Sequence, residues 1–174
     1  LSTKVFDSLV AVRKEVEMLD AYMSLMCYRY SDIIYRSEIE PGALDIEIPN
    51  FILQPLLENS LMHGLKDRRY QGTIILKIYR NEQDKNELNI WLIDDGIGIP
   101  DDKMAELNAY NAKDSEALYR VQTRTEGDRT HLGVINVISR LKLYYQENAE
   151  VIYMRNETGG TTVKIKIKTA SEET

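Results

Sequence analysis

The stretch Leu53-Gln-Pro-Leu-Leu-Glu-Asn-Ser-Leu-Met-His-Gly64 combines a helical apolar pattern with an unusual polar group. Its apolar face is formed by residues at helical spacing, namely Leu53, Leu56, Leu57, Ser60 and Leu61. Glu58 and Asn59 place a carboxylate and an amide between them, and His63 follows one turn later. Mg²⁺ takes oxygen ligands from side chains and substrate together. The stretch therefore predicts an amphipathic helix. Its polar pair suits either a buried hydrogen-bonding network or a divalent cation with the phosphates of a nucleotide, and the rest of the chain has to decide between them.

Composition restricts the classes of protein to consider. With 174 residues, 43% apolar and 29% charged, the chain is one ordinary domain or one domain with an extension. A net charge of −6 speaks against nucleic-acid binding. No apolar run approaches the ~18 residues of a membrane span and no signal peptide is visible, so we expect no direct membrane contact. The chain begins at Leu1 rather than Met, and we expect it to be a piece of a longer protein.

Several common site types find no support in the sequence. The lone cysteine, Cys27, lies in an apolar helical stretch and is expected to be a buried thiol in a reducing compartment. Two histidines without Cys/His ligand spacing make a zinc site a poor candidate. The sequence contains neither a Gly-x-x-x-x-Gly-Lys-Ser/Thr phosphate loop nor the His-Arg-Asp and Asp-Phe-Gly triplets of protein kinases.

Residues 5–30 carry apolar side chains whose spacings alternate between four and three: Val5, Leu9, Val12, Val16, Leu19, Met23, Met26 and Tyr30. This heptad-like seam predicts one long helix. Two interpretations of residues 5–18 stay open at this point. The seam either packs on the domain's own sheet or pairs with another helix, as in a dimer.

The remaining segments predict the fold class. Apolar alternation and turn residues predict strands at 33–40, 73–80, 87–93, 150–155 and 161–168, a short extended piece at 45–49, and helices at 101–109 and 132–145. Residues 110–131 show little apolar periodicity and are expected to form a long mobile loop, part of a lid at about 101–131. We expect an α+β two-layer sandwich, with a mixed, mostly antiparallel sheet of about five strands covered on one face by helices.

Three glycine-bearing motifs could bind a nucleotide. Asp94-Asp-Gly-Ile-Gly98 follows a strand, so its backbone can approach a flat ligand while Asp94 accepts a hydrogen bond from an exocyclic amine. Gly133 lies where the 132–145 helix is expected to begin, and a helix N-terminus binds phosphate. Gly159-Gly160-Thr161 could place a hydroxyl near the base. Taken singly, each motif is more often a turn or a structural glycine than a ligand contact.

Taken in order, these motifs resemble one family. Leu-Leu-Glu-Asn-Ser-Leu-Met-His-Gly, Asp-Asp-Gly-Ile-Gly-Ile, Leu-Gly-Val-Ile-Asn-Val-Ile-Ser-Arg-Leu-Lys-Leu-Tyr-Tyr and Gly-Gly-Thr look like the N, G1, G2 and G3 boxes. These boxes mark the ATP-binding domain of bacterial sensor histidine kinases, a Bergerat fold shared with gyrase, Hsp90 and MutL. Ile-Pro-Asn-Phe-Ile-Leu-Gln-Pro-Leu-Leu-Glu-Asn and Arg-Leu-Lys-Leu-Tyr-Tyr are similar to the LytS/YesM-type subfamily. The resemblance spans roughly residues 15–168.

The resemblance implies ATP and Mg²⁺ as ligands. The residues it assigns to ATP are Asn59, His63, Asp94, Gly96, Gly98, Gly133, Thr161 and Thr162. Asn59 would ligate Mg²⁺ that bridges the phosphates. Asp94 would bind the adenine amine with one of the two threonines, and Gly96 and Gly98 would pass beneath the base. Gly133 would contact the phosphates at the helix N-terminus. Glu58 would be the candidate base.

The resemblance also implies a reaction and its partners. Residues 1–30 would be the C-terminal end of a dimerisation and phosphoacceptor region, and residues 31–170 the catalytic domain. The γ-phosphate of ATP would pass to an upstream histidine, because neither His63 nor His131 has the Pro-His-Phe context of an acceptor. The full-length parent would be a membrane-anchored homodimer with this domain in the cytoplasm, serving a response regulator. Two alternatives stay open: a non-catalytic nucleotide-sensing module and a serine kinase that acts on an anti-sigma antagonist.

Three residues depart from the family pattern. Met62 stands where many relatives have a lysine that reaches the phosphates. The candidates to replace that charge are Lys66, Arg68, Arg124 and Arg129. His131 stands where the second box usually has its first glycine, and a side chain there would narrow the phosphate approach. Asp95 replaces a common asparagine, a mild change.

Overall fold

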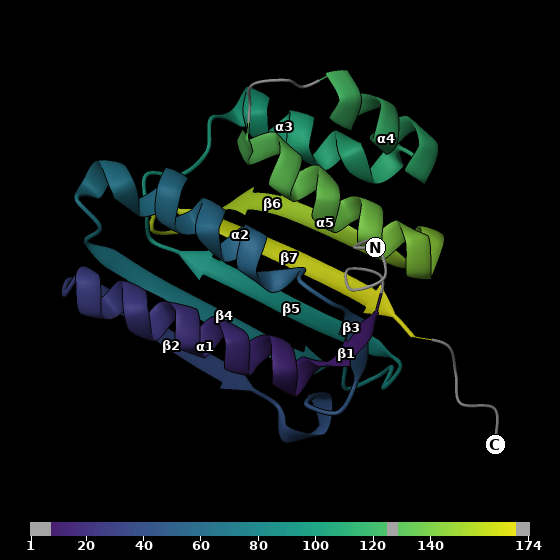
Figure 1. Cartoon of the computed structure of the whole chain (residues 1–174), viewed down its shortest axis with the longest axis horizontal. Coiled ribbons are helices and arrows are strands. Elements are labelled where there is room, and N and C mark those ends of the chain that lie inside the picture. Colours follow the sequence, from purple (N-terminus) through teal and green to yellow (C-terminus); the bar gives the residue numbers. More distant parts are fainter. Residues whose placement is uncertain (1–7, 125–128, 170–174) are drawn as a thin grey trace, which may run out of the picture.

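The computed structural model describes residues 8–124 and 129–169 as two layers, a sheet and the helices that cover one of its faces (Figure 1). The sheet has five strands in the order β2-β4-β5-β7-β6. Only β2 and β4 run parallel; the other neighbours are antiparallel. The predicted α+β sandwich with a mixed, mostly antiparallel sheet is therefore confirmed.

The strands of this sheet agree closely with the predicted segments. Their bounds are β2 (Ile33–Ile39), β4 (Gly72–Arg80), β5 (Glu87–Asp94), β6 (Ala149–Arg155) and β7 (Thr161–Lys168). In β7, Val163, Ile165 and Ile167 are buried, whereas the lysines between them are not. This alternation leaves one face of the sheet under the helices and the other in solvent.

In the described part of the chain, five α-helices accompany the sheet: α1 (Val12–Arg29), α2 (Leu53–Asn59), α3 (Asp101–Ala109), α4 (Ser115–Arg124) and α5 (Arg129–Tyr145). Figure 1 shows α1, α2 and α5 lying across one face of the sheet, with α3 and α4 on its β6 side. Their inward residues share one core with the strands, and the predicted apolar face of α2 is buried throughout. Among the described helices, none has both the length and the apolar character that crossing a bilayer requires.

The helix that begins as α2 changes its geometry after Asn59. Residues Ser60–Leu65 form a π-helix, and Lys66–Arg68 follow as a 3₁₀ turn. Ser60, Leu61, Gly64 and Leu65 are buried in this segment. π-Helical turns are rare and often occur at functional sites. The wider turn sets which residues beyond Asn59 face the loop that follows β5.

The prediction of one helix over residues 5–30 is wrong at its start. Leu9–Ala11 form a short strand, β1, antiparallel to β3 (Glu47–Pro49), and the helix begins only at Val12. A three-residue strand next to a helix can continue the same apolar spacing, so periodicity did not separate them. From Val12 onward the seam is buried in the domain's own core. Residues 1–7 lie outside the described residues, and the assignment of residues 1–30 to a dimerisation region stays a prediction.

The prediction of a long loop over residues 110–131 is also wrong. Tyr110–Ala112 form a 3₁₀ turn, and α4 and the start of α5 occupy much of the rest. Asp114 caps α4, because its Oδ1 accepts a hydrogen bond from the Ala117 N–H at 2.7 Å. Buried Leu118 and partly buried Val121 supply a narrow apolar stripe, too narrow for periodicity to reveal. Whether this region acts as a lid stays a prediction.

Cys27 is only partly buried. Its side chain packs against the core from α1, and this burial raises the pKa of the thiol. The expected burial of Cys27 is therefore wrong in degree, because the thiol is half-buried and partly in contact with solvent.

Candidate nucleotide-binding site

A cavity of about 360 Å³ lies where β5 ends and β7 begins, bordered by α2, the π-helix and α3. Its volume falls in the range of small-molecule sites. Five of the predicted site residues line it: Asn59, His63, Asp94, Gly98 and Thr161. Its lining does not include Glu58, Gly96, Gly133 or Thr162. The structure thus brings the ends of three separate motifs to one hollow.

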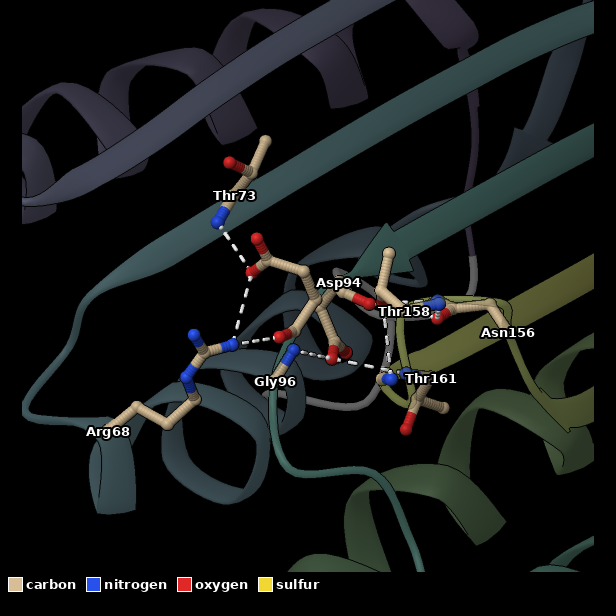
Figure 2. Close-up of polar contacts among 9 residues, drawn as sticks. Arg68, Thr73, Asp94, Gly96, Asn156, Thr158 and Thr161 are labelled. Carbon is tan, nitrogen blue, oxygen red and sulfur yellow. Dashed lines mark hydrogen bonds and ion pairs between the residues drawn. The ribbon is translucent and has the colours of Figure 1, made fainter.

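Asp94 is the most constrained acid of the cavity. It ends β5, is 2% exposed, and its Oδ1 accepts hydrogen bonds from the N–H groups of Gly96 at 3.0 Å and Thr161 at 3.2 Å (Figure 2). Burial raises the pKa of this carboxyl above its ordinary value, and the two backbone bonds oppose the rise. A carboxylate held by its neighbours in this way can accept a hydrogen bond from an exocyclic amine.

Asp95 has a structural role instead. Its Oδ1 accepts a hydrogen bond from the Thr73 N–H at 2.7 Å, and Arg68 contacts both its backbone carbonyl and its carboxylate (Figure 2). These contacts tie the end of β5 to the start of β4. They also engage Arg68 away from the cavity, so Arg68 is a poor replacement for the cation that Met62 does not provide.

Gly96 packs against backbone. A Cβ atom at this position would lie 2.4 Å from the carbonyl oxygen of Gly64 in the π-helix. The neighbouring Ile97 N–H donates to that same oxygen at 3.0 Å. Gly98 differs, because it lines the cavity and has a φ of +79°, a conformation that side chains disfavour. The structure gives Gly96 a close-packing role, and its place beneath a base stays a prediction.

Gly133 is inside a helix, not at its start. Because α5 begins at Arg129, Gly133 is its fifth residue, and the expected helix N-terminus at Leu132-Gly133 is wrong. Among the described residues, and leaving aside the helix's own backbone, a Cβ atom at Gly133 would meet the Pro55 Cβ at 3.8 Å and nothing else within 4 Å. Its predicted contact with phosphates stays a prediction. The side chain of His131 lies outside the described residues, so the expected narrowing there is equally untested.

These two glycines give a matched pair of variants. Gly96→Ala should lower the free energy of unfolding by about 1–3 kcal/mol, because the new methyl group meets rigid backbone. Gly133→Ala should instead raise it by about 0.5–1 kcal/mol, since alanine replaces glycine in a helix interior with room for the methyl group. Urea unfolding followed by circular dichroism measures both, and a Gly96→Ala protein as stable as the parent would contradict the close contact with Gly64.

The two candidate threonines lie on opposite faces of β7. Thr161 lines the cavity together with Val163, as strand alternation requires. Thr162 points to the other face, where its hydroxyl accepts a hydrogen bond from Asn156 Nδ2 at 3.3 Å. Of the two, Thr161 is the one that the geometry favours as a ligand contact.

Asn59 and Glu58 end α2 at the cavity border. Asn59 Nδ2 is buried without a hydrogen-bond partner among the described residues, whereas Glu58 accepts a hydrogen bond from Gln54 Nε2 at 3.1 Å. The described residues contain no group of three or more His, Cys, Asp or Glu that could hold a metal ion. A cation here would therefore need phosphate oxygens and water beside Asn59, as Mg²⁺ commonly does. Asn59 would contribute its amide oxygen, Oδ1, to such a ligand set.

Among the lining residues that the sequence did not assign to the site, four have polar side chains: Ser60, Asp67, Lys103 and Tyr153. The Ser60 hydroxyl lowers the pKa of Asp94, and its place on the apolar face of the helix was the signal. Lys103, in the first turn of α3, is the one lysine or arginine among the described lining residues, and its Nζ lies 3.4 Å from Glu106 Oε2. Lys103 thus brings a positive charge to the cavity, whereas Met62 is uncharged.

A buried acid from α1 holds the start of α2. Glu15 is 4% exposed, and its carboxylate accepts hydrogen bonds from the N–H groups of Phe51 at 2.7 Å and of Ile52 and Leu53 at 3.2 Å each. From the other side, Arg140 of α5 donates to the Asn50 carbonyl at 2.8 Å. The helix that carries Asn59 is thus capped by Glu15 of α1, and the segment just before it is hydrogen-bonded to Arg140 of α5.

Comparisons with known proteins agree with this geometry. Residues 45–171 match the family model described as histidine kinase-, DNA gyrase B- and HSP90-like ATPase. The chain is 34% identical over 159 residues to the sensor protein LytS of Oceanobacillus iheyensis, covering 91% of this chain and 25% of that protein. It is 30% identical over 169 residues to LytS of Staphylococcus epidermidis, covering 94% of this chain and 26% of that protein. The chain thus spans about a quarter of the length of these relatives.

Solved structures show the same fold at low identity. The catalytic domain of the histidine kinase ThkA superposes with a TM-score of 0.61 at 14% identity, over 93% of this chain and 95% of that one. The histidine kinase domain of the blue-light activated kinase of Erythrobacter litoralis gives a TM-score of 0.58 at 19% identity, over 91% and 61% of the two chains. The fold is therefore shared with these histidine kinase domains.

Proposed function

Because this chain belongs to the histidine kinase-, DNA gyrase B- and HSP90-like ATPase family, and is the ATP-binding catalytic domain of a sensor kinase, we propose that it transfers the γ-phosphate of ATP to a histidine. The acceptor histidine would lie on an upstream dimerisation segment outside these 174 residues. The single observation that carries the proposal is buried Asp94, held by two backbone N–H groups at a cavity that Asn59 also lines. Asp94 suits the adenine ring of a nucleotide, and Asn59 suits a cation together with the phosphates.

Each residue contributes to binding or orientation. Asp94 would accept a hydrogen bond from the adenine amine, with the Thr161 hydroxyl beside it, and Asn59 would hold Mg²⁺ together with the phosphates; all three residues line the cavity. Bound Mg²⁺ neutralises charge on the transferred group. Lys103 provides positive charge at the cavity, and His63, which lines it from the π-helix, would contact the phosphates. Phosphoryl transfer depends chiefly on such positioning and electrostatic stabilisation.

Glu58 is the candidate base for the acceptor imidazole. It adjoins Asn59 at the end of α2, and its Oε1 is held by Gln54. It does not line the cavity itself, and its carboxylate lies near Tyr22 of α1, whose pKa is raised by burial and then by this acid. A partner segment would have to reach it from outside the cavity. A carboxylate there can accept the imidazole proton as the phosphoryl group arrives.

The relatives named as sensor proteins extend the proposal to partners. We place the acceptor on the chain's own dimerisation region in a homodimeric, membrane-anchored parent, with this domain in the cytoplasm and a response regulator downstream. A second candidate is a non-catalytic nucleotide-sensing module of the same fold. The observation that favours it is Met62, which lines the cavity where many relatives carry a phosphate-binding lysine.

An ATP titration with and without Mg²⁺ tests the site, and γ-labelled ATP with a supplied acceptor segment tests the reaction. We expect saturable binding that Mg²⁺ strengthens, and label on the acceptor histidine. Asn59→Ala should lower the ATP affinity measured in Mg²⁺ by about 10-fold and leave the affinity measured without Mg²⁺ unchanged. Binding without labelling would favour the sensing module, and no binding at millimolar ATP would exclude both candidates.

A further inference from the structure

Two polar atoms at the cavity lack hydrogen-bond partners among the described residues. They are Nδ2 of Asn59 and the hydroxyl of Tyr153, both buried. Tyr153 as a whole is only 4% exposed. Buried polar groups in folded proteins are almost always bonded. Two such atoms line the same cavity, one a donor and the other able to accept, so they can satisfy each other.

Tyr153 is held rigidly in place. It lies in β6 opposite Val163 of β7, with its backbone bonded on the outer side by Asn108 of α3. The Asn108 amide donates to the Tyr153 carbonyl at 2.9 Å and accepts from the Tyr153 N–H at 2.7 Å. Burial raises the pKa of Tyr153, so its hydroxyl keeps its proton at neutral pH, and the neighbouring Asn59 amide opposes that rise. The two side chains therefore lie close enough to interact.

The chemistry of an asparagine ligand explains what such a neighbour can do. Only the oxygen of an amide can bind a hard cation, and rotation by half a turn exchanges it with the nitrogen. Without a partner for its N–H groups, the amide has no preference between these two orientations. A hydroxyl can accept one hydrogen bond from the amide N–H, and this bond fixes the orientation. Mutation of residues that orient metal ligands in this way typically lowers metal affinity by about 10–100-fold.

We propose that Tyr153 is a positioning residue for the cation site: its hydroxyl accepts a hydrogen bond from Asn59 Nδ2 and directs Oδ1 of the same amide to the cation. The inference rests on the proposed ATP site and adds a residue to it. Tyr153 would act through Asn59 and need not touch the nucleotide. Its removal should therefore weaken cation-dependent binding alone.

Tyr153→Phe tests this role, because it deletes the hydroxyl and keeps the ring. ATP is titrated into the chain by calorimetry in excess Mg²⁺ and again in EDTA. We expect about a tenfold loss of affinity in Mg²⁺ and no change in EDTA. Tyr35→Phe is the matched control, since Tyr35 in β2 also has a buried hydroxyl without a described partner but does not line the cavity. It should change neither affinity.

A double-mutant cycle with Asn59→Ala shows whether the effect passes through Asn59. In that background, Tyr153→Phe should cause no further loss. Unchanged Mg²⁺-ATP affinity in Tyr153→Phe would overturn the proposal, and so would an equal loss in Mg²⁺ and EDTA, which indicates a general structural role. A parent protein that binds ATP equally well with and without Mg²⁺ would refute the cation site itself, and the role of Tyr153 with it.

Discussion

Asp94→Asn should weaken ATP binding by about 10–150-fold, the largest effect on affinity expected from a single side chain. A hydrogen bond to a charged group contributes about 1.5–3 kcal/mol, and 1.4 kcal/mol corresponds to a factor of ten. The amide keeps an oxygen for the Gly96 and Thr161 N–H groups, so the fold has no reason to fail. Calorimetric titration with ATP measures the loss. Asp95→Asn is the control, because Asp95 bonds Thr73 outside the cavity.

The pH dependence gives a second measurement of the same residue. Burial raises the pKa of Asp94, so the folded protein binds this proton more tightly than the unfolded chain does. Stability should therefore fall as pH rises from the ordinary aspartate range through the raised pKa, whereas ATP affinity should increase because ionised Asp94 is the better acceptor. Asp94→Asn should lose both trends. An Asp94→Asn protein that binds ATP like the parent would remove Asp94 from the site.

Glu15→Ala should lower the free energy of unfolding by about 3 kcal/mol. It removes the acceptor for three backbone N–H groups at the buried start of α2, and a lost cap or an unsatisfied buried donor each costs about 1–2 kcal/mol. For a chain of this size the corresponding drop in Tm is about 6–12 °C. Differential scanning calorimetry measures it.

Glu17→Ala is the matched control for this variant. Glu17 lies on the exposed side of the same helix, so its loss should change stability by less than about 0.5 kcal/mol. Because α2 also carries Asn59, Glu15→Ala should weaken Mg²⁺-supported ATP binding even at temperatures where the protein stays folded. Equal Tm values for the two variants would show that the cap contributes nothing.

The sequence predicted what repeats along the chain and missed what depends on distant pairing. Strand alternation in β7 and the helical face of Leu53–Leu61 were strong enough to give both elements and their buried sides. The short strand β1 could not be read, because only its pairing with Glu47–Pro49 makes it a strand. Helix α4 was missed because most of its residues are polar and its stability comes from a cap and a narrow apolar contact.

The site shows the same division. Asp94 and Asn59 stand out in the sequence because an acid beside glycines and an amide in an apolar helix break the local pattern, and both line the cavity. Glu15 was not found, since it lies 36 residues from the Phe51 N–H that it accepts, and no local rule connects them. Gly133 was placed at a helix start because glycine often marks a boundary, whereas α5 continues through it. Tyr153 looked like one more apolar strand residue.

The π-helical turn at Ser60–Leu65 makes the spacing of this site sensitive to chain length. A π-turn bonds each N–H one residue further back than an α-helix does, so it takes up one additional residue per turn. Removing a single residue from this segment would restore a regular α-helix. Gly64 would then rotate, and its carbonyl oxygen would lose the hydrogen bond from the Ile97 N–H that joins it to the loop after β5. A deletion that makes the helix more regular would thus rotate its second half about the helix axis relative to its first half. Asn59 would keep its place while everything after it turned to a different side.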